Sequence, residues 1–243
     1  MNNLTKSQQK LADLLLDTKT HTKVRRRRFG QDDEVEFYYV ERDTSPIDFR
    51  ENEEEFAFVH HEQNPTAPLS PVKVNLRKMP DSLNMKIAEC MAEMKLKQNP
   101  DLCTGIPNAA IPYAKDYAQI TGIPYVTLFD KDDSPGSPRI LAAADAPRGD
   151  DKTILIIDDV ITKGASKFRA FKVAEELGYK VLGLVVLIDR DEGGKEMIEE
   201  AGYKFYAPLK LKDLLDYYLE KRMISEDLYT ETVNYLKQSK RVD

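Results

Sequence analysis

The sequence predicts an α/β protein whose doubly wound, mainly parallel sheet is flanked by helices. Three times the chain passes from a short apolar segment through a turn into a helical pattern, and the apolar segments are continuous and rich in β-branched residues. Continuous apolar strands separated by helices are typical of a parallel sheet that is covered on both faces.

The strand and helix pairs follow one another along the chain. They are predicted at 102–104 with 108–120, at 154–157 with 166–177, and at 181–188 with 195–201. A helix is also predicted from Pro80, because Pro80, Asp81 and Ser82 offer cap chemistry and apolar residues then recur every three or four positions. A further strand is predicted at 125–129, and two closing helices within 211–238.

The first third of the chain is more polar. Spaced leucines predict an amphipathic helix near residues 4–15, the segment 35–40 predicts a strand, and alternation over 72–76 predicts a half-buried strand. The run Arg25–Arg28 is expected on a solvated face or in ion pairs, with residues 53–55 as candidate partners.

A histidine pair and one cysteine are further candidates for chemical sites. His60 and His61 are expected at the surface, because adjacent side chains cannot easily face one metal ion. Cys103 is expected to be a buried structural thiol, since no basic residue neighbours it in the sequence.

Composition excludes several classes of protein. Of 243 residues, 41% are apolar and 32% charged, so the chain can bury a core and is not a disordered chain. The apolar run 181–188 is far shorter than the roughly 20 residues of a membrane-spanning helix. With no apolar leader and only two cysteines, we expect a cytoplasmic protein that does not engage a membrane. A net charge of −6 weighs against nucleic acid as a general partner.

The segment 154–166 carries the clearest chemical pattern. Four aliphatic residues lead to Asp158 and Asp159 at the carboxyl end of a predicted strand, where open α/β sheets bind ligands. The turn Thr162–Ser166 then enters a helix and directs backbone N–H groups and the positive end of the helix dipole to one point. Phosphate fits that turn and sugar hydroxyls fit the carboxylates, so a ribose 5-phosphate suits the whole segment. The carboxylates would also favour positive charge that develops on the anomeric carbon.

A plainer interpretation is a strand that ends in a solvated Asp-Asp turn and caps the next helix. The ligand interpretation accounts for more of the 13-residue segment.

This segment resembles the phosphoribosyl-pyrophosphate signature of type I phosphoribosyltransferases. Four other segments resemble orotate phosphoribosyltransferases in the same order. They are a Ser-Pro strand at 70–77, a pyrophosphate loop at 105–112, an Asp-Arg-x-Glu-Gly segment at 186–194, and a helix start at 211–215. The resemblance covers about residues 68–238 and implies the type I fold with an N-terminal hood. It also implies one domain over 1–243, with hood and N-terminal elements at 1–80, the core at 81–207 and C-terminal helices at 208–243.

The implied reaction is Mg²⁺-assisted transfer of ribose 5-phosphate from phosphoribosyl pyrophosphate to a nucleobase, orotate or a related base, in nucleotide synthesis. Asp158 and Asp159 would hold the ribose hydroxyls, and Arg190 and Thr162 would contact the base. The rest of the phosphoribosyl site would consist of Val160, Ile161, Thr162, Lys163, Gly164, Ala165 and Ser166, and possible pyrophosphate contacts are Lys131, Ala109 and Ala110. The substrate's own pyrophosphate and water would hold Mg²⁺, without an all-protein metal cage. The resemblance further implies a homodimer.

The chain departs from the resemblance at the pyrophosphate clamp. Where the family has an Arg-Lys pair and a Lys-x-His-Gly loop, alignment on Gly136 gives Phe129, Asp130, Asp133 and Pro135. The segment 130–151 holds six aspartates against three basic residues and should repel a pyrophosphate. The upstream loop has Ala109 in place of a lysine, and Lys73-Val74 stands where an aromatic pair stacks on the base.

Three hypotheses therefore stay open. The chain is a transferase with substitute cations, for which Lys131, Arg139, Lys163 and Arg148 are the candidates. Alternatively, it is a catalytically silent sensor of a phosphoribosyl ligand or nucleotide on the same fold. The third hypothesis is a nucleic-acid-binding regulator that uses Arg25–Arg28.

Overall fold

The computed structural model describes residues 3–29, 34–51, 55–62, 64–132 and 139–240. At its centre lies a parallel sheet with strand order β10-β9-β8-β5, and β11 also pairs with β9. The strands are β5 (Leu102–Gly105), β8 (Thr153–Ile161), β9 (Lys180–Asp189), β10 (Lys204–Tyr206) and β11 (Leu209–Lys210). The predicted parallel α/β architecture is confirmed.

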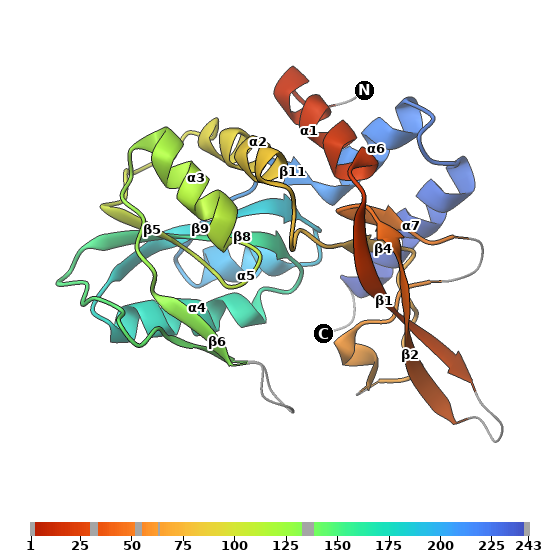
Figure 1. Ribbon diagram of the computed structural model, residues 1–243, viewed down its shortest axis with the longest axis horizontal. Helices are drawn as coiled ribbons and strands as arrows, with labels where there is room; N and C mark the ends of the chain where they lie inside the picture. Colours follow the sequence, from red (N-terminus) through yellow and green to blue (C-terminus); the bar gives the residue numbers. More distant parts are fainter. Residues whose placement is uncertain (1–2, 30–33, 52–54, 63, 133–138, 241–243) are drawn as a thin grey trace.

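Helices cover both faces of this sheet (Figure 1). On one face lie α2 (Asp81–Ala92) and α3 (Ile111–Thr121), and on the other α4 (Ala165–Glu176) and α5 (Gly194–Glu200). Alternate residues of β8 enter two different hydrophobic clusters, Leu155 and Ile157 toward α2 and α3, and Ile154 and Ile156 toward α4. This double burial explains why the strand is continuously apolar.

A second group of elements stands beside the sheet, and we call it the N-terminal unit. It comprises α1 (Lys6–Asp17), β1 (Thr20–Phe29), β2 (Val35–Thr44), β3 (Ile47–Phe49), the short helix η2 (Val59–Glu62) and β4 (Val72–Val74). β1 pairs with β2 and β3 with β4, both antiparallel.

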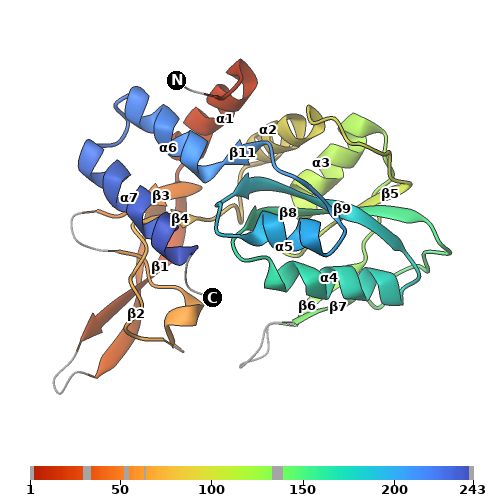
Figure 2. The ribbon, with the colours of Figure 1, turned by 180° about the vertical axis from the view of Figure 1, so that it is seen from behind.

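The closing helices are α6 (Leu211–Glu220) and α7 (Glu226–Ser239), as the sequence predicts. Figure 2 shows α7 beside the strands of the N-terminal unit. There Arg50 forms a two-pronged ion pair with Glu231 of α7, with nitrogen–oxygen distances of 2.7–2.9 Å.

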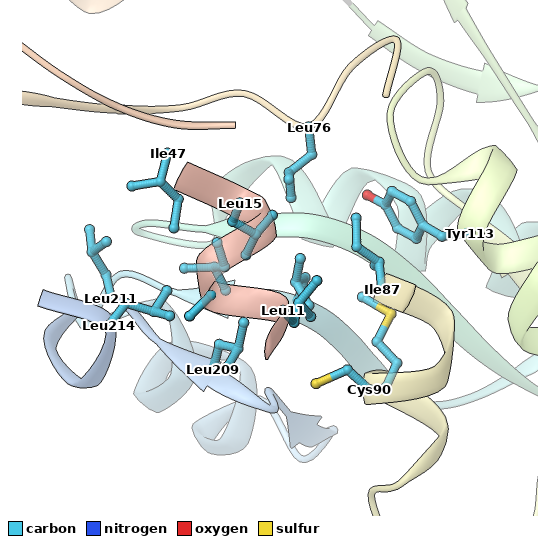
Figure 3. Packing of buried hydrophobic residues seen from close by; sticks show 14 of the residues in the cluster. Leu11, Leu15, Ile47, Leu76, Ile87, Cys90, Tyr113, Leu209, Leu211 and Leu214 are labelled. Carbon is cyan, nitrogen blue, oxygen red and sulfur yellow. The ribbon is translucent and has the colours of Figure 1, made fainter. Parts of the chain in front are cut away.

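One hydrophobic cluster joins the N-terminal unit and α6 to the sheet. Leu11 and Leu15 of α1 pack among Leu209, Leu214 and Ile87, which come from β11, α6 and α2 (Figure 3). Cys90 and Cys103 are buried free thiols in the same cluster, and burial raises the pKa of each to about 12. Cys103 is therefore the structural thiol that the sequence predicts.

The prediction of a strand at 125–129 is wrong. Tyr125 makes a single parallel bridge to Cys103, and regular pairing starts again only at Phe129. There β6 (Phe129–Asp132) pairs with β7 (Arg139–Ala142) in an antiparallel hairpin, outside the main sheet. The chain leaves the edge of β5 after one bridge because its next partner is β7.

Other boundaries differ from the predictions for similar reasons. β8 continues through the two aspartates to Ile161 because β9 pairs with it along that whole length. β4 ends at Val74, where the amide of Asn75 turns to donate to Pro46, although Leu76 is still buried.

The arginine run makes internal contacts. Arg25 pairs with Glu62 and stacks on Phe37, Arg28 pairs with Glu36, and Arg26 is 2% exposed and donates to the carbonyl of Glu55. Residues 53 and 54 lie outside the described residues.

The surface placement predicted for His61 is wrong. His61 is fully buried, its Nδ1 accepts from the amide of Phe58 at 2.8 Å, and its Nε2 lies 3.1 Å from the carbonyl of Pro68. These backbone contacts satisfy the ring inside the fold. In the part of the chain that the structure describes, no helix has the length and apolar character needed to span a membrane.

Candidate functional site

The two aspartates lie in the last part of β8, within the strand and not after it as predicted. Asp158 pairs with Val186 and Val160 with Ile188 of β9. Nζ of Lys167 reaches Asp158 from α4, and the next residue of a strand points to the opposite face, so Asp159 lies on the side of Tyr113 in α3.

Asp158 is almost completely buried, at 4% exposure, and both its carboxylate oxygens are engaged. Oδ1 accepts from the amide of Asp159 at 2.8 Å, and Oδ2 forms an ion pair with Nζ of Lys167. Lys167, also buried, comes from the first turn of α4. Asp159 is half-buried, and its Oδ1 accepts from the amide of Val160 at 2.7 Å.

Burial and these contacts shift the pKa values of Asp159, Lys167 and Tyr113. Burial, followed by the charge of Asp158, raises the pKa of Asp159 to about 7, although Lys167 opposes the shift. Burial works to lower the pKa of Lys167, but the charges of Asp158 and Asp159 outweigh it and the pKa is raised. Burial and then the charges of Asp159 and Asp158 raise the pKa of Tyr113 of α3. The cluster therefore holds two acids, one cation and a neutral phenol.

The turn after β8 is exposed and leads directly into α4. Gly164 has a left-handed φ of +85° and precedes α4, whose 12 residues span about 18 Å. Thr162, Lys163, Ala165 and Ser166 are all exposed around it. Exposed amides at the start of a helix bind phosphate well, so the predicted phosphate turn has a suitable local geometry.

Arg190 extends the site at the end of β9. Its backbone amide donates to Ile161 at 3.1 Å, which fixes the Arg190 loop beside the phosphate turn. Its side chain is 6% exposed, and Nε lies 2.8 Å from Oε1 of Glu192. Gly194 also packs closely against the phosphate turn. A Cβ at position 194 would lie 2.3 Å from the carbonyl oxygen of Thr162, so only glycine fits there.

A cavity of about 500 Å³ opens against Thr162, Lys163 and Arg190. Glu192 lines it beside Arg190, and the other walls come from the N-terminal unit and α7, through Phe58, Asn64, Ala67, Pro68, Tyr235, Gln238 and Ser239. The volume suits a small molecule. The structure thus brings together the two residues that were predicted to contact a base.

The predicted pyrophosphate contacts are placed less uniformly. Ala109 and Ala110 are buried in the loop that joins β5 to α3, and the amide of Ile106 at its start donates to Ile157 at 2.9 Å. That loop therefore lies next to Asp158. Lys131 is half-buried on β6. Asp133, Pro135 and Gly136, on which the clamp alignment depends, lie outside the described residues.

One of the substitute cations is placed away from the site. Arg148 donates to the carbonyl of Glu176 at 2.9 Å, at the far end of α4 from Ser166. Because an α-helix rises about 1.5 Å per residue, Glu176 and Ser166 lie more than 10 Å apart, and Arg148 is correspondingly far from the turn. Lys163 lines the cavity, and the side chain of Arg139 lies outside the described residues.

Sequence reasoning missed Lys167, Phe58 and Tyr235. Lys167 had a visible signal, because it occupies the inward face of α4 with Ala170, Phe171 and Ala174 at helical spacing. A lysine on an apolar stripe needs a buried partner. Phe58 and Tyr235 join the cavity only through tertiary packing and carry no local signal.

A metal ion held by the protein itself would need several ligating side chains close together. Among the described residues, no group of three or more His, Cys, Asp or Glu side chains is arranged to hold a metal ion. The acid pair is the candidate carboxylate group at the site, and the Lys167 ammonium beside it makes that pair a weaker attractor of a divalent cation.

The chain is similar to proteins of known activity. Residues 78–205 match the phosphoribosyl transferase domain. The orotate phosphoribosyltransferase of Aquifex aeolicus is 33% identical over 139 residues, which cover 53% of this chain and 72% of that enzyme. The orotate phosphoribosyltransferase of Pyrobaculum islandicum is 31% identical over 173 residues, 70% of this chain and 86% of that enzyme. The solved structure of Leishmania donovani UMP synthase superposes with a TM-score of 0.64 at 23% identity. The superposed part covers 79% of this chain and 40% of the synthase chain.

Proposed function

Because the chain is an orotate-phosphoribosyltransferase-like member of the phosphoribosyl transferase family with the type I fold, we propose that it transfers ribose 5-phosphate from phosphoribosyl pyrophosphate to a nucleobase. The bond from the anomeric carbon to pyrophosphate breaks, pyrophosphate leaves with the electron pair, and a ring nitrogen of the base bonds to that carbon. Orotate is the first candidate base and pyrimidine nucleotide synthesis the setting, as the names of the relatives suggest.

A single observation carries this proposal. The acid pair at the end of β8 runs directly into the exposed turn 162–166 at the start of α4, so carboxylates and anion-binding amides lie within one short segment. Ribose hydroxyls meet Asp158 or Asp159, and the 5-phosphate meets the amides of the turn. Val160 and Ile161 hold the two parts at a fixed spacing as members of β8.

The cavity beside the turn is the proposed base site. Arg190 and Thr162 offer polar contacts, while Phe58 and Tyr235 offer aromatic surface that the Lys73-Val74 segment does not. The Arg190 guanidinium is paired with Glu192, so its remaining N–H groups supply the contacts to an acceptor base.

Mg²⁺ enters this proposal with the substrate. It is a hard cation that keeps water ligands and binds substrate phosphates, and it would neutralise the leaving pyrophosphate. The buried loop of Ala109 and Ala110 beside Asp158 is the proposed neighbour of the pyrophosphate, together with Lys131.

The domain organisation, location and oligomeric state of the chain belong to the same proposal. We propose one domain over 1–243, which the hydrophobic cluster joining α1, α2 and α6 supports. We also propose a cytoplasmic homodimer, and light scattering after size exclusion should give a mass near twice 27.8 kDa. The internal contacts of Arg25–Arg28 weigh against a nucleic-acid regulator.

The test is pyrophosphate release from phosphoribosyl pyrophosphate and Mg²⁺ with a panel of bases that begins with orotate. Turnover that Asp158→Asn with Asp159→Asn abolishes, while the circular dichroism spectrum is unchanged, supports the proposal. The acidic segment 130–151 and the pairing of Asp158 with Lys167 favour the silent sensor as second candidate. Binding of phosphoribosyl pyrophosphate by calorimetry without turnover of any base would select that sensor.

A further inference from the structure

The two aspartates of β8 are not equivalent, and the difference comes from Lys167. Both oxygens of Asp158 are engaged, one by the amide of Asp159 and one by the ammonium of Lys167. For Asp158 to accept a hydrogen bond from a ribose hydroxyl, a buried cation would have to lose its ion-pair partner. Breaking a buried pair is costly, because it leaves an uncompensated charge in the interior.

The carboxylate of Asp159 can accept further hydrogen bonds. Asp159 is more exposed than Asp158, and its Oδ1 accepts one backbone hydrogen bond. Asp159 has no ion-pair partner among the described residues, so its Oδ2 is the carboxylate oxygen of the pair that is left for a ligand.

A second, independent observation lies on the same side of the sheet. The hydroxyl of Tyr113 is fully buried and has no hydrogen-bond partner within the described residues. Tyr113 belongs to α3, toward which Asp159 points, and the charge of Asp159 acts on it more strongly than that of Asp158. Unsatisfied buried hydroxyls are rare and mark places where water or a ligand completes the network. The unused hydrogen-bonding capacity therefore gathers around Asp159.

We propose that Lys167 is a positioning residue that locks Asp158 into the protein framework, so that Asp159 alone of the pair receives the ribose hydroxyls. This assignment rests on the proposed phosphoribosyl function. It makes the ribose site a single-carboxylate site, with Lys167 cancelling the charge of the other carboxylate.

The test is isothermal titration of phosphoribosyl pyrophosphate with Mg²⁺ into the full-length chain and its variants. Asp159→Asn should weaken binding at least tenfold. Asp158→Asn should change affinity less than threefold, because its amide oxygen still accepts from the amide of Asp159, and its main effect should be a lower melting temperature.

Variants of Lys167 give a readout that a purely structural lysine would not affect. The groups that face Asp159 are Asp158 from β8, Lys167 from α4 and Tyr113 from α3. Lys167→Met removes the only cation of these, so the pH midpoint for binding should rise by about one unit or more. Lys167→Arg should restore the wild-type midpoint, and Lys172→Met, an exposed position of the same helix, should leave it unchanged.

The outcomes separate the two proposals. A wild-type chain that binds no phosphoribosyl pyrophosphate overturns the proposed function, and this assignment with it. A wild-type chain that binds, with Asp158→Asn losing as much affinity as Asp159→Asn, overturns the assignment alone. If Lys167→Met does not fold, the comparison of the two asparagine variants still decides.

Discussion

At the scale of single residues, the ionisation of Asp159 should couple stability to pH. Its pKa is raised from 3.8 to about 7 in the folded chain by burial and by Asp158. Between about pH 4 and pH 7 the folded chain therefore keeps a proton that the unfolded chain has released. The free energy of unfolding should fall as pH rises through that window, because the native state binds more protons there.

The size of this effect follows from the shift. One pKa unit corresponds to about 1.4 kcal/mol, and solvent screens the half-buried Asp159, so we expect a loss of roughly 1–3 kcal/mol. Asp159→Asn removes the titration and should flatten the pH dependence relative to wild type. Urea unfolding at pH 4.5, 6 and 8 measures the difference, and parallel curves for the two proteins would contradict the prediction.

Residue-scale chemistry was readable from the sequence where it is local. Asp158, Asp159 and Thr162 lie within five positions at the end of one strand, so their proximity needed no tertiary information. The pairing of Lys167 with Asp158 depends on how α4 packs on the sheet, and neighbouring residues in the sequence do not determine it.

At the scale of elements, two loops share one narrow contact, that of Gly194 with Thr162. A Cβ at position 194 would approach the Thr162 carbonyl to 2.3 Å, so Gly194→Ala should displace the phosphate turn. We expect the KM for phosphoribosyl pyrophosphate to rise about tenfold or more, since a shift of the turn misplaces several amides together.

Gly202 supplies the matched control for this change. It has a φ of +90° at the end of α5, and a Cβ there would meet nothing within 4 Å. Gly202→Ala should lower stability by about 1 kcal/mol through backbone strain without raising KM. Equal KM values for wild type and Gly194→Ala in steady-state kinetics would show that the loop contact is irrelevant.

The end of α7 forms part of the cavity wall and is tied to the Arg190 loop. Nζ of Lys240 lies 3.1 Å from Oδ1 of Asp191 and 3.7 Å from Oε1 of Glu196. Lys240→Met should loosen this wall and raise the KM for the base severalfold while kcat stays the same, because exposed ion pairs contribute less than about 1 kcal/mol. Lys237→Met, exposed on the same helix, is the control, and identical base KM values for both variants would rule out the tie.

Elements with strong periodicity were predicted well, and short ones were not. The helices α2, α4, α6 and α7 match their apolar patterns because each buries one face. The segment 125–129 has strand-like composition, yet only Tyr125 pairs with the edge strand of the sheet. Phe129 already pairs with β7 instead. Strand pairing is decided by the available partner, and the partner lies elsewhere in the sequence.

At the scale of the whole molecule, the cavity joins parts that sequence order keeps apart. Residues 58–68, the ends of β8 and β9, and the last turns of α7 all line it. The parallel sheet and its phosphate turn could be predicted, because each strand–turn–helix unit is local. The contribution of α7 could not, since it depends on the cluster that docks α1 and α6 on the sheet (Figure 3).

This architecture predicts how a ligand stabilises the chain. A ligand present at about 100 times its dissociation constant adds about 2.7 kcal/mol to the free energy of unfolding. For a chain of this size that corresponds to a rise in Tm of roughly 5–11 °C. Since one hydrophobic cluster spans the N-terminal unit and the sheet, phosphoribosyl pyrophosphate with Mg²⁺ should shift a single calorimetric transition. Asp159→Asn at the same ligand concentration should shift little. A second transition that the ligand leaves in place would mean that the N-terminal unit unfolds independently of the site.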